Sequence, residues 1–333
     1  MKTMIYFLAA SAMMLSACSS EDNTVVNNGP VEAQITANIG GPLTRAADQT
    51  WTASDAIGVR VTGVNGTTDG ITSTMQTLYQ NVKYVTSASS TSATFAPAAT
   101  GQGIFFQDAN ETVTFSAYYP YVASTDAKTL PGTDGVITGA DTQDQTTQAK
   151  QEACDYLFAS GATASKSAPT VSFSGDEHLF KHKMARLQLK IKTSADNGFT
   201  ADQVTTGTYK LNGLVHTGTF NVTDGDAKAT GSAVNDWNIT GNLYTDADNV
   251  RTYTMILYPQ SLMLPLTFAA TIDGQTFTNN TNIFAGSPGA AFTVQSGNSY
   301  TYTITVKKTG IVISGCTIEK WNTIDNINGD ATM

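Results

Sequence analysis

The residue with the most specific chemistry is a cysteine near the N-terminus. Cys18 follows Leu15-Ser16-Ala17, and before it come a basic residue, Lys2, and an apolar run over residues 4–15. These features are typical of a secretory signal peptide, and the run is too short to span a bilayer. A cysteine at this place completes a lipobox, in which the thiol is acylated and the cysteine becomes the new N-terminus. We therefore expect a signal peptide over residues 1–17 and a lipid such as palmitate on Cys18. The alternative is an ordinary signal peptide that contains a cysteine.

A second residue of chemical interest is an arginine in a junction rich in small residues. Arg45 lies between Gly40-Gly41-Pro42 and Ala46-Ala47, whereas the chain's other arginines lie in or beside expected strands: Arg60, Arg186 and Arg251. A protease reaches exposed loops more readily than hydrogen-bonded strands. We expect an enzyme that cuts after arginine to act at Arg45 and to leave Ala46 as the new N-terminus.

Residue pairs that could bind a metal or catalyse a reaction do not have the required spacing. His178 and His182 are four residues apart beside Glu177, but in a strand this spacing separates them by about 13 Å. The segment Asp246-Ala247-Asp248-Asn249 resembles the start of a calcium loop without its glycine and final acid. Nucleophile elbows, phosphate-binding loops and dinucleotide fingerprints are missing from the sequence. We expect no enzymatic activity, no metal and no cofactor.

Aromatic residues supply the remaining candidates for ligand binding. Tyr118, Tyr119 and Tyr121 surround Pro120, and Trp237 is isolated. Such rings could form a platform on which sugars stack, or they could be core and packing residues. Both interpretations stay open at this point.

Composition limits the classes of protein and of partner. The 333 residues are 41% hydrophobic and only 14% charged, with a formal net charge of −9. The apolar fraction is sufficient for a large core. The acidic balance argues against nucleic acid as a partner. Cys154 and Cys316 could form a disulfide after export, but two separate small apolar side chains are the simpler interpretation.

The elements that must position these residues are mostly strands. Apolar residues alternate with polar ones over residues 31–39, and the same period recurs over 113–121, 185–191, 264–272 and 300–306. A period of two indicates half-buried strands. Asp273-Gly274 predicts a hairpin turn, and residues 144–153 are the best candidate for a short helix. The pattern predicts an all-β protein, most simply one built of sandwiches.

Breaks in this pattern divide the chain into segments. Residues 19–30 are a polar spacer, and residues 161–176 lack large apolar side chains except near their end. We expect a signal peptide over 1–17, a lipidated tether with a removable strand over 18–45, an N-terminal sandwich over 46–176 and a C-terminal sandwich over 177–333.

The removable strand connects the arginine to a function. Its inward-facing residues are expected to be Val31, Ala33, Ile35, Ala37 and Ile39. A cut after Arg45 would separate this strand from the rest of the chain and leave an apolar groove between unpaired strand edges. Such a groove recruits another strand. If a second copy supplies that strand, the head-to-tail contact propagates into a filament.

The order of several short segments resembles the fimbrillin family, the type V pilins of anaerobic oral and gut bacteria, in its Mfa-like branch. The segments are the lipobox at Cys18 and residues 43–46, 51–59, 115–121, 155–159, 179–187, 297–300 and 318–321. The resemblance implies two tandem transthyretin-like antiparallel β-sandwich domains. It also implies a lipoprotein of the outer membrane that is cut by an Arg-specific protease and polymerises with other pilin subunits into an adhesive surface pilus.

The resemblance further implies a donor strand near the C-terminus. Its apolar residues would be Ile311, Ile313, Ile318 and Trp321, although Ser314-Gly315-Cys316 interrupts their alternation. The choice among shaft, anchor and tip subunit, and the surface receptor, stay open. The competing hypothesis is a monomeric glycan-binding lipoprotein that keeps its tether and uses Tyr118, Tyr119, Tyr121 or Trp237.

Overall fold

A computed structural model describes residues 29–41, 50–194, 198–240, 242–245, 250–262, 266–279 and 292–321. The expected signal peptide, Cys18, Arg45 and Ala46 lie outside these residues. Within them, no helix is both long and apolar enough to cross a membrane.

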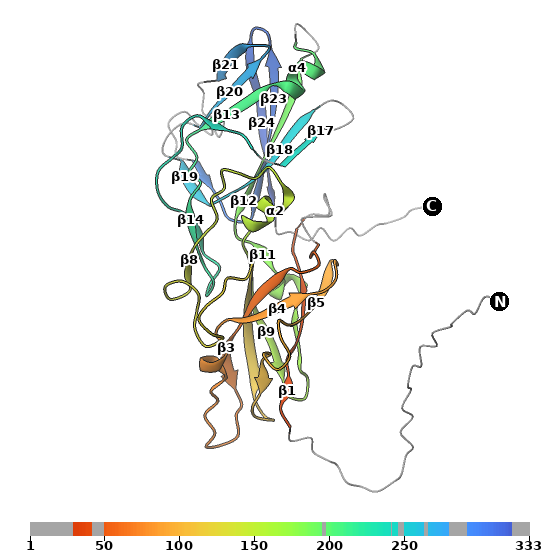
Figure 1. Cartoon of the computed structure of the whole chain (residues 1–333), viewed down its shortest axis with the longest axis vertical. Coiled ribbons are helices and arrows are strands. Elements are labelled where there is room, and N and C mark those ends of the chain that lie inside the picture. Colours follow the sequence, from red (N-terminus) through yellow and green to blue (C-terminus); the bar gives the residue numbers. More distant parts are fainter. Residues whose placement is uncertain are drawn as a thin grey trace, which may run out of the picture. The chain divides into compact units, whose positions relative to one another are not determined.

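The N-terminal half is organised around an eight-stranded sheet with the order β10-β2-β5-β4-β3-β7-β9-β11. Figure 1 labels β3, β4, β5, β9 and β11 of this sheet. Its elements are β1 (Val31–Glu32), β2 (Gln34–Asn38), β3 (Ala56–Asn65), α1 (Met75–Leu78), β4 (Val82–Thr86), β5 (Ser92–Pro97), β6 (Phe105–Phe106), β7 (Thr112–Tyr119), β8 (Val136–Thr138), α2 (Gln148–Ala153), β9 (Leu157–Ser165), β10 (Thr170–Phe173), α3 (Gly175–His178) and β11 (Lys181–His182). One hydrophobic cluster joins side chains from β2, β3, β5, β7, β9 and β10. The short helix expected within residues 144–153 is confirmed as α2.

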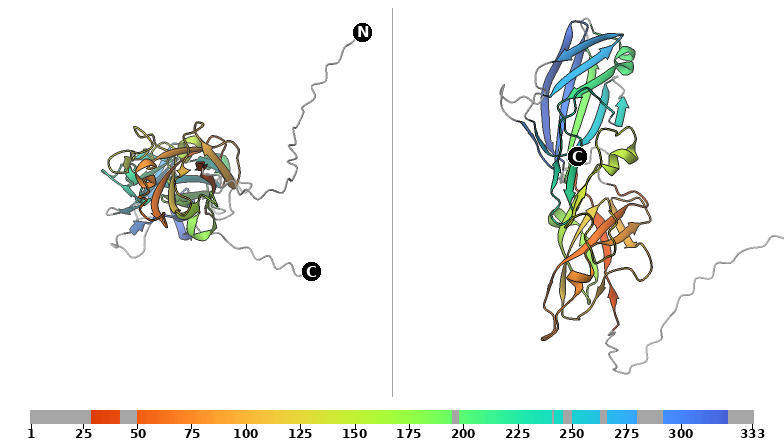
Figure 2. Two further views of the ribbon diagram at one scale, coloured as in Figure 1. Left: turned by 90° about the horizontal axis from the view of Figure 1, so that it is seen from below. Right: turned by 60° about the vertical axis from the view of Figure 1, so that its left-hand side comes forward.

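Among the described residues, the C-terminal half contains two larger sheets, with the orders β17-β18-β12-β23-β24 and β16-β13-β20-β21, and the short pair β19-β22. Its strands β14 and β15 form a three-stranded sheet with β8. Its elements are β12 (Ala185–Thr193), α4 (Ala201–Thr206), β13 (Thr208–Asn212), β14 (Gly218–Asn221), β15 (Ala227–Ala229), β16 (Trp237–Asn238), β17 (Asn242–Thr245), β18 (Arg251–Leu257), β19 (Gln260–Leu262), β20 (Thr267–Ile272), β21 (Gln275–Asn279), β22 (Phe292–Val294), β23 (Asn298–Lys307) and β24 (Gly310–Lys320). The blue strands β23 and β24 run side by side in Figure 2. The hairpin expected at Asp273-Gly274 is confirmed between β20 and β21.

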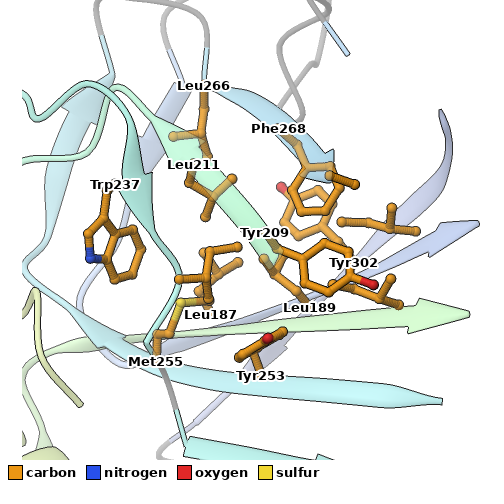
Figure 3. Packing of buried hydrophobic residues seen from close by; sticks show 14 of the residues in the cluster. Leu187, Leu189, Tyr209, Leu211, Trp237, Tyr253, Met255, Leu266, Phe268 and Tyr302 are labelled. Carbon is orange, nitrogen blue, oxygen red and sulfur yellow. The ribbon is translucent and has the colours of Figure 1, made fainter. Parts of the chain in front are cut away.

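Alternating side chains explain why the two C-terminal sheets pack together. In β12, Leu187 and Leu189 are fully buried while Lys190 is exposed. Figure 3 shows these leucines facing Leu211 of β13 and Phe268 of β20 in a shared core. The all-β fold expected from the period of two is confirmed. Most neighbouring strands are antiparallel, but β12 pairs with β23, and β2 with β10, in parallel.

Strands also cross the expected division at residue 176, which falls within α3. Lys181 and His182 pair with β9 of the first sheet, and β8 pairs with β14 of the second half. Phe220 and Tyr258 of the second half share a hydrophobic cluster with Tyr118 and Tyr156 of the first. The two halves are therefore joined by strand pairing and by apolar packing.

Candidate functional site

The strand expected to be removable lies in the interior of the first sheet. β2 is antiparallel to β5, with Ile35 opposite Phe95, and parallel to β10, with Ile35 opposite Val171. The preceding β1 pairs with β6. Because β2 has hydrogen-bonded neighbours on both sides, its removal would expose two strand edges.

The side chains of this strand contribute to the core as the alternation predicts. Ala33, Ile35 and Ala37 are buried, Val31 and Ile39 are half-buried, and all five belong to or pack against the first hydrophobic cluster. Burying a side chain the size of Ile35 contributes about 1.5–3 kcal/mol. The strand is therefore held by apolar burial as well as by its backbone.

Trp51 and Phe180 form hydrogen bonds with the backbone at the C-terminal end of β2. The buried Trp51 indole Nε1 donates to the Ala37 carbonyl over 3.0 Å. The Phe180 amide donates to the Asn38 carbonyl over 3.0 Å, and the Gly40 amide donates to the Phe180 carbonyl over 2.8 Å. The Trp51 ring also makes an edge contact with Phe180, with ring centroids 5.1 Å apart.

The expected cut after Arg45 lies outside the described residues. The three other arginines lie in strands, as expected: Arg60 in β3, Arg186 in β12 and Arg251 in β18. Arg186 is buried, and its Nε donates to Ser299 Oγ over 2.9 Å. None of the three offers a protease an unpaired segment of backbone.

Three of the expected donor residues, Ile311, Ile313 and Ile318, lie in β24, which pairs with β23 at one end of the five-stranded sheet. Trp321 follows β24 directly. Ile311 and Ile313 pack against the C-terminal core, whereas Ile318 is 52% exposed. The register shifts where Tyr302 lies opposite Cys316 and Thr303 opposite Ser314, so Gly315 is the extra residue of a bulge. The interruption seen in the sequence is therefore a real break in register.

Trp321, which directly follows β24, is buried against β11 of the first sheet and β12 of the C-terminal half. Its ring stacks on His182, with centroids 3.8 Å apart and planes 9° apart, and the Arg186 guanidinium lies 5.1 Å from the ring centroid. His182 Nδ1 is 2.9 Å from Asp155 Oδ2. A cavity of about 40 Å³ is lined by His182, Asp155, Ile39 and Trp51. The end of β2 and the base of the C-terminal tail thus meet at one cluster.

Sequence reasoning missed this cluster. In the sequence, His182 is a candidate metal ligand beside His178 and Trp321 is a candidate donor residue, and the two lie in separate segments of the fimbrillin resemblance. The two positions are far apart in the chain, and neither lies in a motif that links them. His178 Nδ1 instead lies 3.0 Å from the Ser160 carbonyl. Within the described ranges, no three His, Cys, Asp or Glu side chains are grouped to hold a metal.

Two of the four proposed sugar platforms are buried, which contradicts that role for them. Tyr118 donates its hydroxyl to Asn81 Oδ1 over 2.8 Å, and Trp237 Nε1 donates to the Gln143 carbonyl over 3.0 Å. Burial raises the pKa of Tyr118. Tyr119 is half-buried, donates to Asp55 and borders the small cavity beside His182, whereas Tyr121 borders a larger cavity.

The two cysteines outside the signal region are not bonded to each other. Cys154 is buried and Cys316 is exposed. Burial raises the pKa of the Cys154 thiol to about 12, so it is neutral at ordinary pH. The interpretation as two buried apolar side chains fits Cys154 and is wrong for Cys316, which is an exposed residue of β24.

Comparison with known proteins shows similarity over nearly the whole chain. A sequence model described as fimbrillin-like matches residues 44–321. A curated relative from Bacteroides uniformis, described as a candidate fimbrium subunit named Fim1C, is 31% identical over 318 residues, which cover 93% of this chain and 92% of the relative.

Two crystal structures of candidate cell adhesion proteins are also similar. One, from Bacteroides ovatus, superposes with a TM-score of 0.69 at 26% identity and covers 89% of this chain and 100% of its own. The other, from Bacteroides uniformis, has a TM-score of 0.62 at 26% identity and covers 88% and 98%.

Proposed function

Because the chain belongs to the fimbrillin-like family, we propose that it is a subunit of a cell-surface fimbria that assembles by exchange of the strand at residues 31–39. The observation that carries this proposal is the place of β2 between β5 and β10, with Ala33, Ile35 and Ala37 buried. A strand in this place completes the core, and its loss creates a site that fits another strand.

Proteolysis supplies the trigger in this proposal. A cut after Arg45 leaves residues 31–39 held only by hydrogen bonds and packing. Once they leave, β5 and β10 expose unpaired backbone groups beside an apolar groove. Unpaired edges and apolar surface favour capture of a strand from a second subunit. The partners are therefore other pilin subunits, and the protease is Arg-specific.

The proposed donor is the C-terminal strand of a neighbouring subunit. Ile311, Ile313 and Trp321 pack within their own molecule, so a departing β24 exposes them unless the neighbour's groove buries them again. The bulge at Gly315 changes which side chains face inward along the donor. A groove that accepts β24 must accommodate that change.

The N-terminal segment gives the proposed route to the surface. Signal peptidase action before Cys18 and acylation of its thiol would hold the precursor in the outer membrane until the cut at Arg45 releases it into the pilus. The role is structural and adhesive; we propose no enzymatic activity.

Digestion of the precursor with an Arg-specific protease tests the proposal. We expect a product that begins at Ala46, followed by filaments in negative-stain electron microscopy. Arg45→Ala should block both the cut and the filaments, and Arg45→Lys should block an Arg-specific enzyme but not trypsin. A product that stays monomeric after the cut, or filaments from the Arg45→Ala protein, would contradict strand exchange triggered at this residue.

The competing function is a monomeric glycan-binding lipoprotein. Tyr121 is the observation that favours it, because this ring borders a cavity. Protein that keeps residues 19–45 under the same digestion and stays monomeric would favour this alternative.

A further inference from the structure

A cavity of about 540 Å³ opens in the N-terminal half. It lies among the end of α1, the start of β4, the loop before β6 and the segment after β7. Its size falls in the range of pockets that hold small ligands. Neither the family nor the strand exchange gives it a role.

Aromatic rings line part of this cavity. Tyr79, Phe105 and Tyr121 all border it, and the Phe105 amide donates to the Tyr79 hydroxyl over 3.2 Å. Tyr121 is half-buried. Rings of this kind offer rigid apolar area to the C–H face of a pyranose.

Hydrogen bonds order the segment that borders the cavity after β7. Asn81 Nδ2 donates to the Val122 carbonyl and to Ser124 Oγ, both over 2.9 Å, and its Oδ1 accepts from Tyr118. The Asn81 amide also donates to the Ala127 carbonyl over 3.0 Å. A ligand therefore meets a wall that is already formed, which lowers the entropy that binding must overcome.

The charges at the cavity favour an anion. Lys83 and Lys128 are exposed and border it, and among the described residues neither forms a salt bridge. Lys83 Nζ lies 5.3 Å from the centroid of the Tyr121 ring. The acidic residue of the lining, Asp126, accepts at Oδ1 from the Lys128 amide and from Thr129 Oγ1. Two ammonium groups and one carboxylate therefore border the cavity, in a chain of net charge −9.

We propose that this cavity binds the acidic terminal sugar of a glycan, a pyranose that carries a carboxylate. The carboxylate would lie between Lys83 and Lys128, and the sugar ring would pack on Tyr121 and Tyr79. Charge-assisted hydrogen bonds to ammonium groups are stronger than neutral ones. Binding at this cavity does not depend on the proposed assembly into a fimbria. Only its biological use rests on that proposed function, because a surface subunit with this site would adhere to acidic glycans.

Titration of the uncut monomer with sialyllactose, followed by NMR, tests the site. Lactose is the neutral control for sialyllactose, and glucose is the neutral control for a second acidic sugar, glucuronic acid. We expect the two acidic sugars to shift the resonances of residues 79–83 and 121–128, and the neutral ones to bind at least tenfold more weakly. A higher salt concentration should weaken the binding of the acidic sugars, because salt screens exposed charges.

Variants separate the site from non-specific attraction. Lys83→Gln and Lys128→Gln should each weaken binding about tenfold, the size expected for one hydrogen bond to a charged group. Lys228→Gln makes the same charge change at an exposed lysine of β15 and should leave binding unchanged. No binding of the acidic sugars, equal binding of neutral and acidic sugars, or equal loss in all three variants would overturn the proposal. Because the monomer is used, failure here is distinguishable from failure of filament formation.

Discussion

At the scale of single residues, burial decides which side chains are available for chemistry. His216 shows this clearly: it is buried, its Nδ1 lies 2.9 Å from Thr142 Oγ1, and its ring lies 4.3 Å from that of Trp237. Its Nε2 is buried without a hydrogen-bond partner. Burial lowers the pKa of His216 to about 4, although Asp141 acts in the opposite direction. The histidine is therefore a neutral core residue.

This shift predicts a loss of stability in acid. The unfolded chain, with an ordinary histidine pKa near 6.5, binds a proton at a higher pH than the folded chain. The free energy of unfolding should therefore fall as the pH drops from about 6.5 to about 4, by up to about 3 kcal/mol. Urea unfolding of the wild type and of His216→Gln at several pH values measures it. In the His216→Gln protein, the free energy of unfolding should fall less over this pH range. Parallel pH profiles for the two proteins would show that His216 does not cause the loss of stability.

At the scale of elements, the sequence predicts strands better than it predicts their neighbours. The alternation over residues 31–39 is sufficient to identify the buried face of β2, and the break at Ser314-Gly315-Cys316 identifies the bulge in β24. The parallel pairing of β2 with β10 could not be predicted, because Val171 lies far along the chain and pairing is decided by tertiary packing. The contact between His182 and Trp321 could not be predicted either, because tertiary packing brings together two residues that are far apart in the chain. The fimbrillin resemblance itself is confirmed by the matches to known proteins.

The hydrogen bond from Trp51 to the Ala37 carbonyl helps to hold β2 in the sheet, and a substitution at Trp51 removes it. Trp51→Phe keeps most of the ring but loses the hydrogen bond to the Ala37 carbonyl. The loss of one hydrogen bond costs about 0.5–1.5 kcal/mol. Hydrogen exchange should show faster opening of the amides in β2, and filaments should form sooner after the cut at Arg45.

The matched control for this change is Trp237→Phe. It also loses an indole hydrogen bond, to the Gln143 carbonyl, but lies outside the sheet that holds β2. It should lower stability without changing exchange in β2. Equal exchange in β2 for both variants would mean that Trp51 does not retain the strand.

At the scale of the whole molecule, the junction between the halves determines how the protein unfolds. Phe220 of β14 stacks on Tyr156, with ring centroids 4.7 Å apart, and lies opposite Ile137 of β8 in the strand pairing. Both contacts link segments on opposite sides of the expected boundary.

We therefore expect the two halves to unfold together in one calorimetric transition. Phe220→Ala should remove about 3–5 kcal/mol from the junction and separate the unfolding into two transitions, because each half keeps its own core. Phe277→Ala, at the partly buried edge of the C-terminal core, should lower the melting temperature of a single transition. Two transitions in the wild type, or one in the Phe220→Ala protein, would show that the contacts at Phe220 do not couple the halves.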